Sequence, residues 1–363
     1  MTRDTAADVQ RITSHPFCDT GQGRMARRYR FTNRKGNQVD VTDLGAHILA
    51  WRTPGRDGKM ADIVLEHARP EDYLANRGHL GAIPGRYAGR IANAEFTLDG
   101  KTYRVPPKGA GPHALHPNAA AFERRLWQAE PFETASAAGL RLSLTSPDGE
   151  DGFPGMLRLT VTYSFDDEDR LIIDYQALSD KPTVLNLTQH VYFNLAGHGS
   201  GDIGAHEAQI AATQYLPVNA EMVPLGFAAP VAGTALDLRT PKPLNSVWDA
   251  PDPQIRLGGG IDHCWALGDA KRVEPAWAAR VTDPASGRSL DLYTDQPGLI
   301  FYSGNNMAEM PGKDGARYGR RHGFCLETQN FPNAVNQPGF PSAIIKAGET
   351  YTSRTIFQAM ATA

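Results

Sequence analysis

Alternation of hydrophobic and polar residues is the clearest signal along this chain. Between residues 157 and 165, apolar side chains occupy every second position, and Arg, Thr and Ser stand between them. The same period of two returns over 171–177, after the charged turn 166–169. This period is typical of strands with one buried face, so the two segments predict an antiparallel β-hairpin.

Other segments carry strand signals, and few carry helical ones. A second hairpin is predicted over 279–282 and 290–294, joined by the turn 283–287. Further strands are expected over 38–51, 140–146, 183–195, 206–216, 298–303, 323–330 and 350–359, and short helices over 69–76 and 119–127. Because the strands do not alternate with long helices, the pattern favours an all-β antiparallel sandwich or barrel over a doubly wound α/β fold.

Length and composition add limits to this picture. The chain has 363 residues and no composition shift that marks a boundary, so a single domain over 1–363 is expected, with residues 1–17 as a flexible lead-in. A net charge of −3, from 37 basic and 40 acidic residues, gives no electrostatic reason to expect nucleic acid or an anionic membrane as partner. Apolar runs fall far short of the ~18 residues that a membrane span requires.

The N-terminus and the cysteines bear on the compartment. The first residues, MTRDTAADVQRITSHPF, have no apolar core of a signal peptide. Cys18, Cys264 and Cys325 form an odd, sparse set without a CxxC spacing. Such a set suits a reducing cytoplasm and argues against a disulfide framework or a zinc ribbon.

The segment 183–195 is unusually rich in hydrogen-bonding side chains. If it is a strand, one face carries Asn186, Thr188, His190, Tyr192 and Asn194. Exposed sheet faces more often carry Lys, Glu and Thr, so the pattern favours a face that lines a site. A solvated structural face remains the alternative.

A second candidate segment is 322–332, where Glu327 stands among apolar residues. A carboxylate in an apolar strand is either paired in the core or held for chemistry. Together with an imidazole such as His190, it would supply a base and an acid, the minimum for moving two protons.

Three further motifs are weighed against simpler interpretations. Arg86 and Arg90, in 85–93, suit an oxygen-rich ligand, although a surface pair explains them equally well. His113 and His116 form an HxxH pair, but no third ligand follows at a suggestive spacing, so no metal is predicted. The GxGxxG match at 199–204 lacks a βαβ context, so no dinucleotide cofactor is predicted.

Taken in order, these segments resemble the aldose 1-epimerase (galactose mutarotase) family, from about residue 35 to the C-terminus. The resemblance is carried by GRYAGRIANAEFTLDGKTY (85–103), NLTQHVYFNLAG (186–197), YLPVNAEMVPLG (215–226), PVAGTALDLR (230–239), GIDHCWAL (260–267), YTDQPGLIFYSGN (293–305) and GFCLETQNFPNAVNQPGFPSAIIKAGETY (323–351). It implies a large antiparallel β-sandwich with few short helices, no cofactor, and an isomerase that interconverts the α and β anomers of a free aldose. The partner is then a small sugar, and the protein a monomer or a homodimer.

The resemblance also implies roles for particular residues. Glu327, in the CLETQ motif, stands at the family's catalytic base, and His190 stands at its catalytic acid. Arg90, His116 and Asp262 stand where the family holds sugar hydroxyls. We expect ionised Glu327 to take the C1 hydroxyl proton while protonated His190 delivers a proton to the ring oxygen. Tyr192 and Trp265 are candidates to stack on the sugar ring.

Several positions depart from the family pattern. The usual His-Gly-Gly is here His116-Pro117-Asn118, and Gln189 replaces the usual Asn before the acid. Gly89 replaces an Asn, and Ile300 stands where the family often has Gln. Loss of the Gln side chain would remove a hydrogen bond to one hydroxyl, which suggests a different sugar or looser discrimination. The physiological sugar and its pathway are left open.

Three alternatives are kept beside the free-aldose epimerase. A hexose-phosphate 1-epimerase on the same fold would need an additional basic cluster near the cleft. A glycoside hydrolase would use Asp262 and Glu327 as paired carboxylates. A non-catalytic sugar-binding protein would need no acid–base pair, and the presence of both His190 and Glu327 counts against it.

Overall fold

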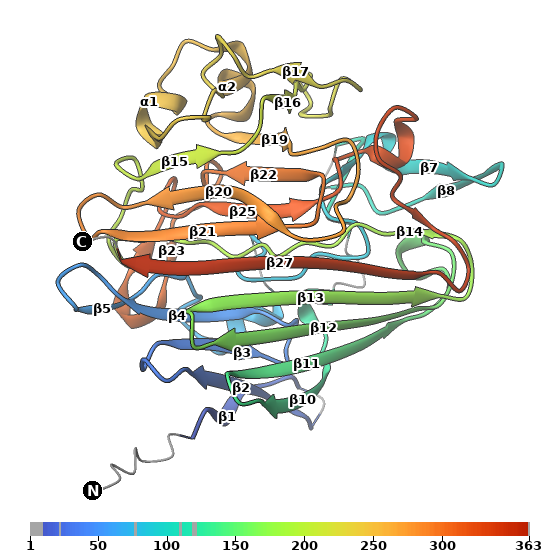
Figure 1. The fold of residues 1–363 in the computed structure, drawn as a ribbon. Coiled ribbons are helices and arrows are strands. Elements are labelled where there is room, and N and C mark those ends of the chain that lie inside the picture. Colours follow the sequence, from blue (N-terminus) through green and yellow to red (C-terminus); the bar gives the residue numbers. More distant parts are fainter. Residues whose placement is uncertain (1–9, 22, 76–77, 109–110, 118–121, 362–363) are drawn as a thin grey trace, which may run out of the picture.

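The computed structural model describes residues 10–21, 23–75, 78–108, 111–117 and 122–361. Its largest sheet is antiparallel, has nine strands and crosses the whole molecule (Figure 1). In sheet order the strands are β10 (Gln128–Glu133), β11 (Ala137–Ser146), β12 (Leu157–Asp166), β13 (Arg170–Ser179), β27 (Thr350–Ala361), β21 (Arg288–Thr294), β20 (Ala276–Thr282), β15 (Glu207–Ile210) and β18 (Lys242–Pro243).

Both predicted hairpins belong to this sheet. Strands β12 and β13 pair in register, with Val161 opposite Tyr175, and the alternate apolar residues of β12 from Leu157 to Phe165 are buried. Strands β20 and β21 form the second hairpin around the turn after Thr282. The strand expectations over 140–146 and 350–359 are also confirmed, in β11 and β27. A period of two was sufficient here because each strand buries one face.

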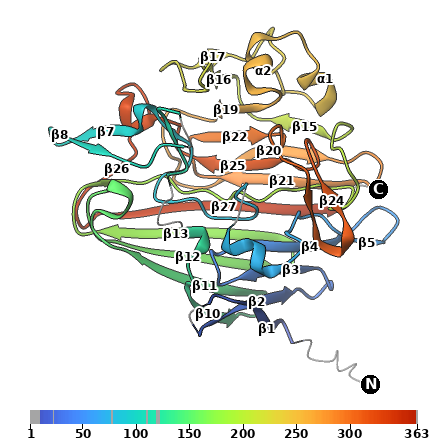
Figure 2. The same cartoon turned by 180° about the vertical axis from the view of Figure 1, so that it is seen from behind.

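Two five-stranded sheets form the other layer (Figure 2). One runs in the order β1 (Ile12–Asp19), β2 (Met25–Thr32), β3 (Gln38–Thr42), β4 (Ile48–Pro54) and β5 (Met60–Asp62). The other runs in the order β17 (Ala229–Pro230), β16 (Gln214–Leu216), β19 (Asp262–Ala266), β22 (Gly298–Tyr302) and β25 (Cys325–Gln329).

One hydrophobic core joins these sheets. Its buried residues come from the nine-stranded sheet, such as Val161 and Phe357, and from both five-stranded sheets, such as Trp51 and Phe301. The predicted all-β sandwich is therefore confirmed. None of the helices in the described ranges has the length and apolar character that crossing a membrane requires.

The remaining elements are short. Two-stranded pairs are β6 (Arg90–Ile91) with β9 (Ala114–Leu115), β7 (Glu95–Leu98) with β8 (Lys101–Arg104), β14 (Thr183–Val184) with β26 (Ile344–Ile345), and β23 (Met310–Pro311) with β24 (Arg317–Tyr318). The 3-10 helices are η1 (Pro70–Leu74), η2 (Ala92–Ala94), η3 (Phe122–Arg124), η4 (Glu150–Gly152), η5 (Lys313–Gly315) and η6 (Ala334–Asn336). The α-helices are α1 (Leu244–Trp248) and α2 (Pro253–Gly258).

Several predicted elements differ from the structure. Residues 38–51 form two strands, β3 and β4, because Gly45 and Ala46 turn the chain with positive φ. Residues 206–216 likewise contain both β15 and β16. The predicted strand over 183–195 is wrong beyond β14: the chain continues there through isolated bridges, because its polar side chains bond to separate segments.

The termini and helices also bring corrections. Residues 12–17, expected within a lead-in, belong to β1, which pairs with β2, whereas residues 1–9 lie outside the described ones. The helix expected over 69–76 is η1, and that over 119–127 is reduced to η3, with 119–121 outside the described residues. Helix α2 was missed although its Asp252 cap, whose carboxylate accepts the Gln254 N–H at 2.8 Å, and its Pro253 are recognised start signals.

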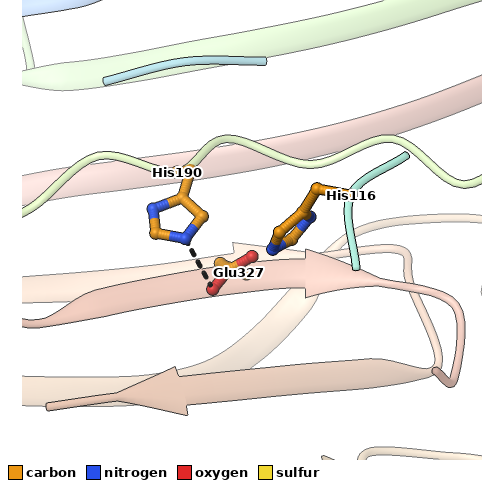
Figure 3. Close-up of side chains that lie close together, drawn as sticks. All are labelled: His116, His190 and Glu327. Atoms are coloured by element: carbon orange, nitrogen blue, oxygen red, sulfur yellow. Dashed lines mark ion pairs between the residues drawn. The ribbon is translucent and has the colours of Figure 1, made fainter. Parts of the chain in front are cut away.

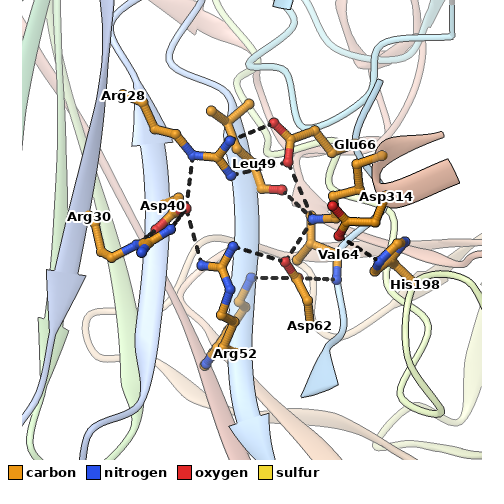
Figure 4. Close-up of polar contacts among 12 residues, drawn as sticks. Arg28, Arg30, Asp40, Leu49, Arg52, Asp62, Val64, Glu66, His198 and Asp314 are labelled. Carbon is orange, nitrogen blue, oxygen red and sulfur yellow. Dashed lines mark hydrogen bonds and ion pairs between the residues drawn. The ribbon is translucent and has the colours of Figure 1, made fainter. Parts of the chain in front are cut away.

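A partly buried network of charges links the first five-stranded sheet to the excursion between β22 and β25 (Figure 4). Asp40 is fully buried, and although burial would raise its pKa, Arg28, Arg30 and Arg52 hold it at about 2. Lys313, on η5, donates to the Leu49 carbonyl at 2.9 Å and to Asp62 at 2.8 Å. The network therefore anchors this excursion to β4 and β5.

Replacing Lys313 with Met should destabilise the fold. Its side chain is 10% exposed, and its loss would leave the carboxylates of Asp62 and Glu66 without their shared cation. We expect the free energy of unfolding to fall by about 3 kcal/mol, measured by urea denaturation. The control is Lys59→Met, since the ion pair of Lys59 with Asp57 is exposed and is expected to contribute little to stability. Equal urea midpoints for the two variants would contradict the anchoring role.

Candidate active site

Three adjacent strands place acidic and aromatic side chains on one face of a sheet. Asp262 of β19 lies opposite Tyr302 of β22, and Ile300 of β22 lies opposite Glu327 of β25. Residues directly opposite in an antiparallel pair share a face, and so do residues two positions apart. This face therefore carries Asp262, Ile300, Tyr302 and Glu327 together.

The other face of the same strands packs into the core. Phe301 and Leu326 are buried there, and so is Trp265, whose Nε1 donates to the Leu236 carbonyl at 3.1 Å. The expectation that Trp265 stacks on a ligand is therefore wrong, because its register position turns it away from the cavity.

The polar face opens into a cavity of about 1010 Å³, at the upper end of the range for ligand pockets. All five residues singled out from the sequence line it: Arg90, His116, His190, Asp262 and Glu327. Tyr192 and Ile300 also line this cavity. The fold thus gathers into one cavity residues that are up to 237 positions apart, from Arg90 to Glu327.

His190 reaches the cavity from an extended segment held against residues 81–82. Its backbone N–H donates to the Ala82 carbonyl at 2.8 Å, and its carbonyl accepts from the Gly81 N–H at 3.0 Å. The neighbouring Val191 is buried in the core, so the imidazole is turned to the opposite side. There His190 Nε2 lies 3.7 Å from Glu327 Oε1 (Figure 3).

The polar side chains of this segment have different roles. All five are buried, so a solvated face is excluded, and His190 and Tyr192 line the cavity as the site-lining interpretation expects. Asn186 instead joins two walls: its amide nitrogen donates to the Ala88 carbonyl at 2.9 Å, and its oxygen accepts the Asn330 N–H at 2.8 Å. It connects the Arg90 segment to the end of the Glu327 strand.

His116 is fixed by backbone bonds to Gly89. The Gly89 N–H donates to His116 Nδ1 at 3.1 Å, and the His116 N–H donates to the Gly89 carbonyl at 3.0 Å. Because Nδ1 accepts, the neutral imidazole carries its proton on Nε2. Gly89 has φ +83°, and a Cβ there would meet Gln329 Nε2 at 3.0 Å. The Gly89 backbone, not a side chain, therefore sets the tautomer of His116. Asn118, which replaces the second Gly of the family's usual His-Gly-Gly, lies outside the described residues.

Arg86 and Arg90 lie in different environments. Arg90 lines the cavity with Nη2 3.7 Å from Asp262 Oδ2, and although burial raises the pKa of Asp262, Arg90 counteracts that rise. Arg86 is buried elsewhere, where it donates to the Ser146 hydroxyl and to the carbonyls of residues 146, 147 and 154. Arg86 therefore neither shares a ligand site with Arg90 nor forms a surface pair with it. Its hydrogen bonds instead connect separate loops.

Burial controls the protonation of the central pair. It raises the pKa of Glu327 to about 8, with nearby Asp262 adding to the rise, and lowers the pKa of His190 to about 3. Near neutral pH the pair therefore holds one proton, on Glu327 in the free protein. From the sequence we expect ionised Glu327 and protonated His190. That form of the pair holds the same number of protons, and a transfer of one proton from Glu327 to His190 produces it.

Glu327 is also incompletely satisfied. Its Oε2 is buried and has no hydrogen-bond partner within the described part of the chain. A buried carboxylate oxygen without a partner is costly, and functional sites are a common reason for one. The arrangement can exchange a proton with a hydroxyl-bearing ligand placed between Glu327 and His190.

His116, His190 and Glu327 also offer three ligand atoms of the kind that bind metals. These atoms lie within 4.8 Å of one another.

His79 is a cavity residue that sequence reasoning missed. Its ring centroid lies 5.1 Å from that of His116 and 5.7 Å from that of His190. Its Nδ1 contacts Glu123 Oε2 at 2.7 Å. A lone His before the GR motif carried no pattern that distinguished it, because its partner lies 44 positions away.

Most of the chain is similar to proteins of one family. A sequence model described as aldose 1-epimerase matches residues 27–358. Galactose mutarotase of Rattus norvegicus is 44% identical over 321 residues, which are 88% of this chain and 90% of that protein. Aldose 1-epimerase of Escherichia coli (strain K12) is 38% identical over 344 residues, which are 93% and 96%.

Solved structures agree with this similarity. An aldose epimerase homologue from C. elegans superimposes with a TM-score of 0.83 at 25% identity, covering 97% of this chain and all of that one. Galactose 1-epimerase from Lactobacillus acidophilus NCFM gives a TM-score of 0.83 at 26% identity, covering 96% and 98%. The similarity thus includes the strands that carry the cavity residues.

Replacing Glu327 with Gln should stabilise the protein increasingly as pH rises. The carboxyl's pKa is about 8 when folded and about 4.5 when unfolded, so between these values only the unfolded chain ionises it, and its contribution to stability falls. A neutral Gln avoids this loss. We expect the variant to exceed the wild type by about 2 kcal/mol or more at pH 8.5 and by little at pH 4.5. Urea denaturation at the two pH values, with exposed Glu133→Gln as control, measures the difference. A gain that does not depend on pH would contradict the raised pKa.

Proposed function

The chain belongs to the aldose 1-epimerase family and interconverts the α and β anomers of an aldose, and we propose that Glu327 and His190 carry the proton transfers. The observation that supports this assignment is the buried pair itself. Glu327 has one oxygen 3.7 Å from His190 and the other without a partner in the described residues, and both side chains line the cavity.

The pair holds the one proton that ring opening requires. A cyclic hemiacetal opens when a base takes the C1 hydroxyl proton and an acid protonates the ring oxygen. Hydroxyl hydrogen bonds to Glu327 favour its ionised form, which moves the shared proton to His190 without changing the net charge of the site. Glu327 then accepts the C1 hydroxyl proton while His190 donates to the ring oxygen, and rotation about C1–C2 followed by the reverse transfers gives the other anomer.

Arg90, His116 and Asp262 are proposed to hold the sugar hydroxyls. Arg90 and Asp262 form a donor and acceptor 3.7 Å apart, and a hydroxyl can bond to both. His116 presents its Nε2–H because Gly89 occupies Nδ1. Ile300, opposite Glu327, gives no hydrogen bond, so the hydroxyl nearest to it is expected to be weakly discriminated.

The substrate is proposed to be a free aldose. A phosphorylated sugar would require a basic cluster. Of the Lys and Arg side chains in the described lining, Arg90 and Arg69 are paired with Asp262 and Asp72, which leaves Lys108 as a single cation rather than a cluster. A glycoside hydrolase would pair two carboxylates, whereas Glu327 forms its ion-pair contact with His190, and Asp262 is held by Arg90.

The setting of the enzyme is also a proposal. Cys18, Cys264 and Cys325 are buried free thiols, which supports a reducing cytoplasm. A monomer or homodimer is proposed, and light scattering of the purified protein distinguishes the two.

Glu327→Gln and His190→Asn should each remove most turnover while the protein stays folded. Each substitution removes one of the two proton-transfer groups, which are typically worth about 10²–10⁴-fold. The measurement is polarimetry on freshly dissolved α-D-glucose, α-D-galactose, pentoses and a hexose 6-phosphate. Exposed His15→Asn and Glu133→Gln are the controls. Full activity of either site variant would refute the assignment, and acceleration of the phosphate alone would favour the phosphorylated-sugar enzyme.

The pH profile of kcat/KM should fall on the alkaline side. As pH rises through about 8, the pair loses its last proton, and no acid remains for the ring oxygen. On the acid side, activity should persist well below pH 6, because the pair gains a second proton, on His190, only near pH 3. Polarimetry from pH 4.5 to 9.5, corrected for the uncatalysed rate, tests this. A rate that increases steadily up to pH 9.5 would contradict the one-proton pair.

A further inference from the structure

His79 lies in the cavity although no motif includes it. It is 8% exposed, and its ring lies beside both His116 and His190. It lines the same cavity as Arg90 and Glu327. His79 is therefore close enough to contact a ligand that is bound against His190.

Glu123 fixes the orientation of this ring. Its Oε2 accepts from His79 Nδ1 at 2.7 Å, and the carboxylate is itself buried. Although burial would raise the pKa of Glu123, the hydrogen bond from His79 lowers it below its usual range. Glu123 is therefore an acceptor at neutral pH, and His79 carries a proton on Nδ1.

The other nitrogen of His79 is next to a second polar group. His79 Nε2 lies 3.5 Å from Lys108 Nζ, and both residues line the cavity. With Nδ1 protonated, a neutral imidazole offers an acceptor at Nε2, and the ammonium offers donors. A hydroxyl both donates and accepts, so it can bond to the two groups at once.

We propose that His79, held by Glu123, and Lys108 form an additional hydroxyl-binding subsite for the aldose. This inference rests on the proposed function, because it assumes that the sugar reacts between Glu327 and His190. His79 is then a specificity-determining residue for a hydroxyl remote from the reacting carbon. Because Ile300, which lies opposite Glu327 in the sheet, supplies no hydrogen bond, this subsite adds recognition beside the histidines of the cavity.

A series of deoxy sugars tests the subsite. The kcat/KM of wild type and His79→Phe is measured by polarimetry for D-glucose, D-galactose and their 2-, 3-, 4- and 6-deoxy analogues. We expect wild type to lose about tenfold to hundredfold on one particular deoxy analogue. His79→Phe should lose a similar factor on the parent sugar and less than about twofold on that analogue, because the hydroxyl and its partner are then both missing.

Three further variants complete the test. Glu123→Gln should show the same pattern with smaller factors, since it loosens His79 without removing it, and it serves if the Phe variant does not fold. His79→Gln, which keeps a hydrogen-bonding end, should recover part of the discrimination. The control is His113→Phe, which removes another His–Glu pair, 3.0 Å from Glu221, from outside the cavity lining.

The pattern of losses separates the possible failures. Equal factors on all sugars for His79→Phe, or no loss on any, would overturn the subsite and leave the catalytic assignment intact. Failure of the proposed catalytic pair would instead appear as full activity of Glu327→Gln. A deoxy-specific loss that the His113→Phe control shares would also overturn the subsite.

Discussion

Keeping one proton on two buried side chains is the constraint around which this structure is arranged. Burial opposes the charge on Glu327 and on His190 alike, so the pair stays neutral overall and shares a single proton near pH 7. Such a pair is useful only if its members stay within proton-transfer distance of the same ligand. The contact of 3.7 Å joins residues from two segments that are linked only locally by backbone pairing, through the isolated antiparallel bridge between Phe193 and Phe324. The rest of the cavity can be understood as the means of holding them there.

Hydrogen bonds and ion pairs between loops do most to keep the cavity residues in position. Asn186 joins the segment of Ala88 to the end of β25, and the Gly89 backbone fixes His116. On the far side, Lys313 ties the excursion after β22 to β4 and β5 through Leu49 and Asp62. All of these bonds are buried except that of Lys313 to Asp62, which is partly buried, and buried polar groups that are fully satisfied favour one arrangement over others. The cavity walls are therefore irregular in backbone and yet well determined.

The sheet β19–β22–β25 has to serve two environments at once. One face of this sheet packs Phe301 and Leu326 into the core, and the other face presents Asp262 and Glu327 to the cavity. A shift of one residue in this register would bury both carboxylates in the hydrophobic core. Stability of the core and identity of the site thus depend on the same pairing, so the apolar face secures the position of the acidic one.

The sequence by itself determined the class of fold and the chemistry. A period of two over 157–177 was enough to predict β12 and β13, and the resemblance to the aldose 1-epimerase family identified Glu327, His190, Arg90, His116 and Asp262 as one set. The irregular path of 186–194, the removal of Arg86 from the site and the burial of Trp265 were decided by tertiary structure. So was the placement of His79 beside the reacting pair. The physical reason is that periodicity reports which side chains share a face, whereas the partner of that face is set by contacts between segments far apart in the chain.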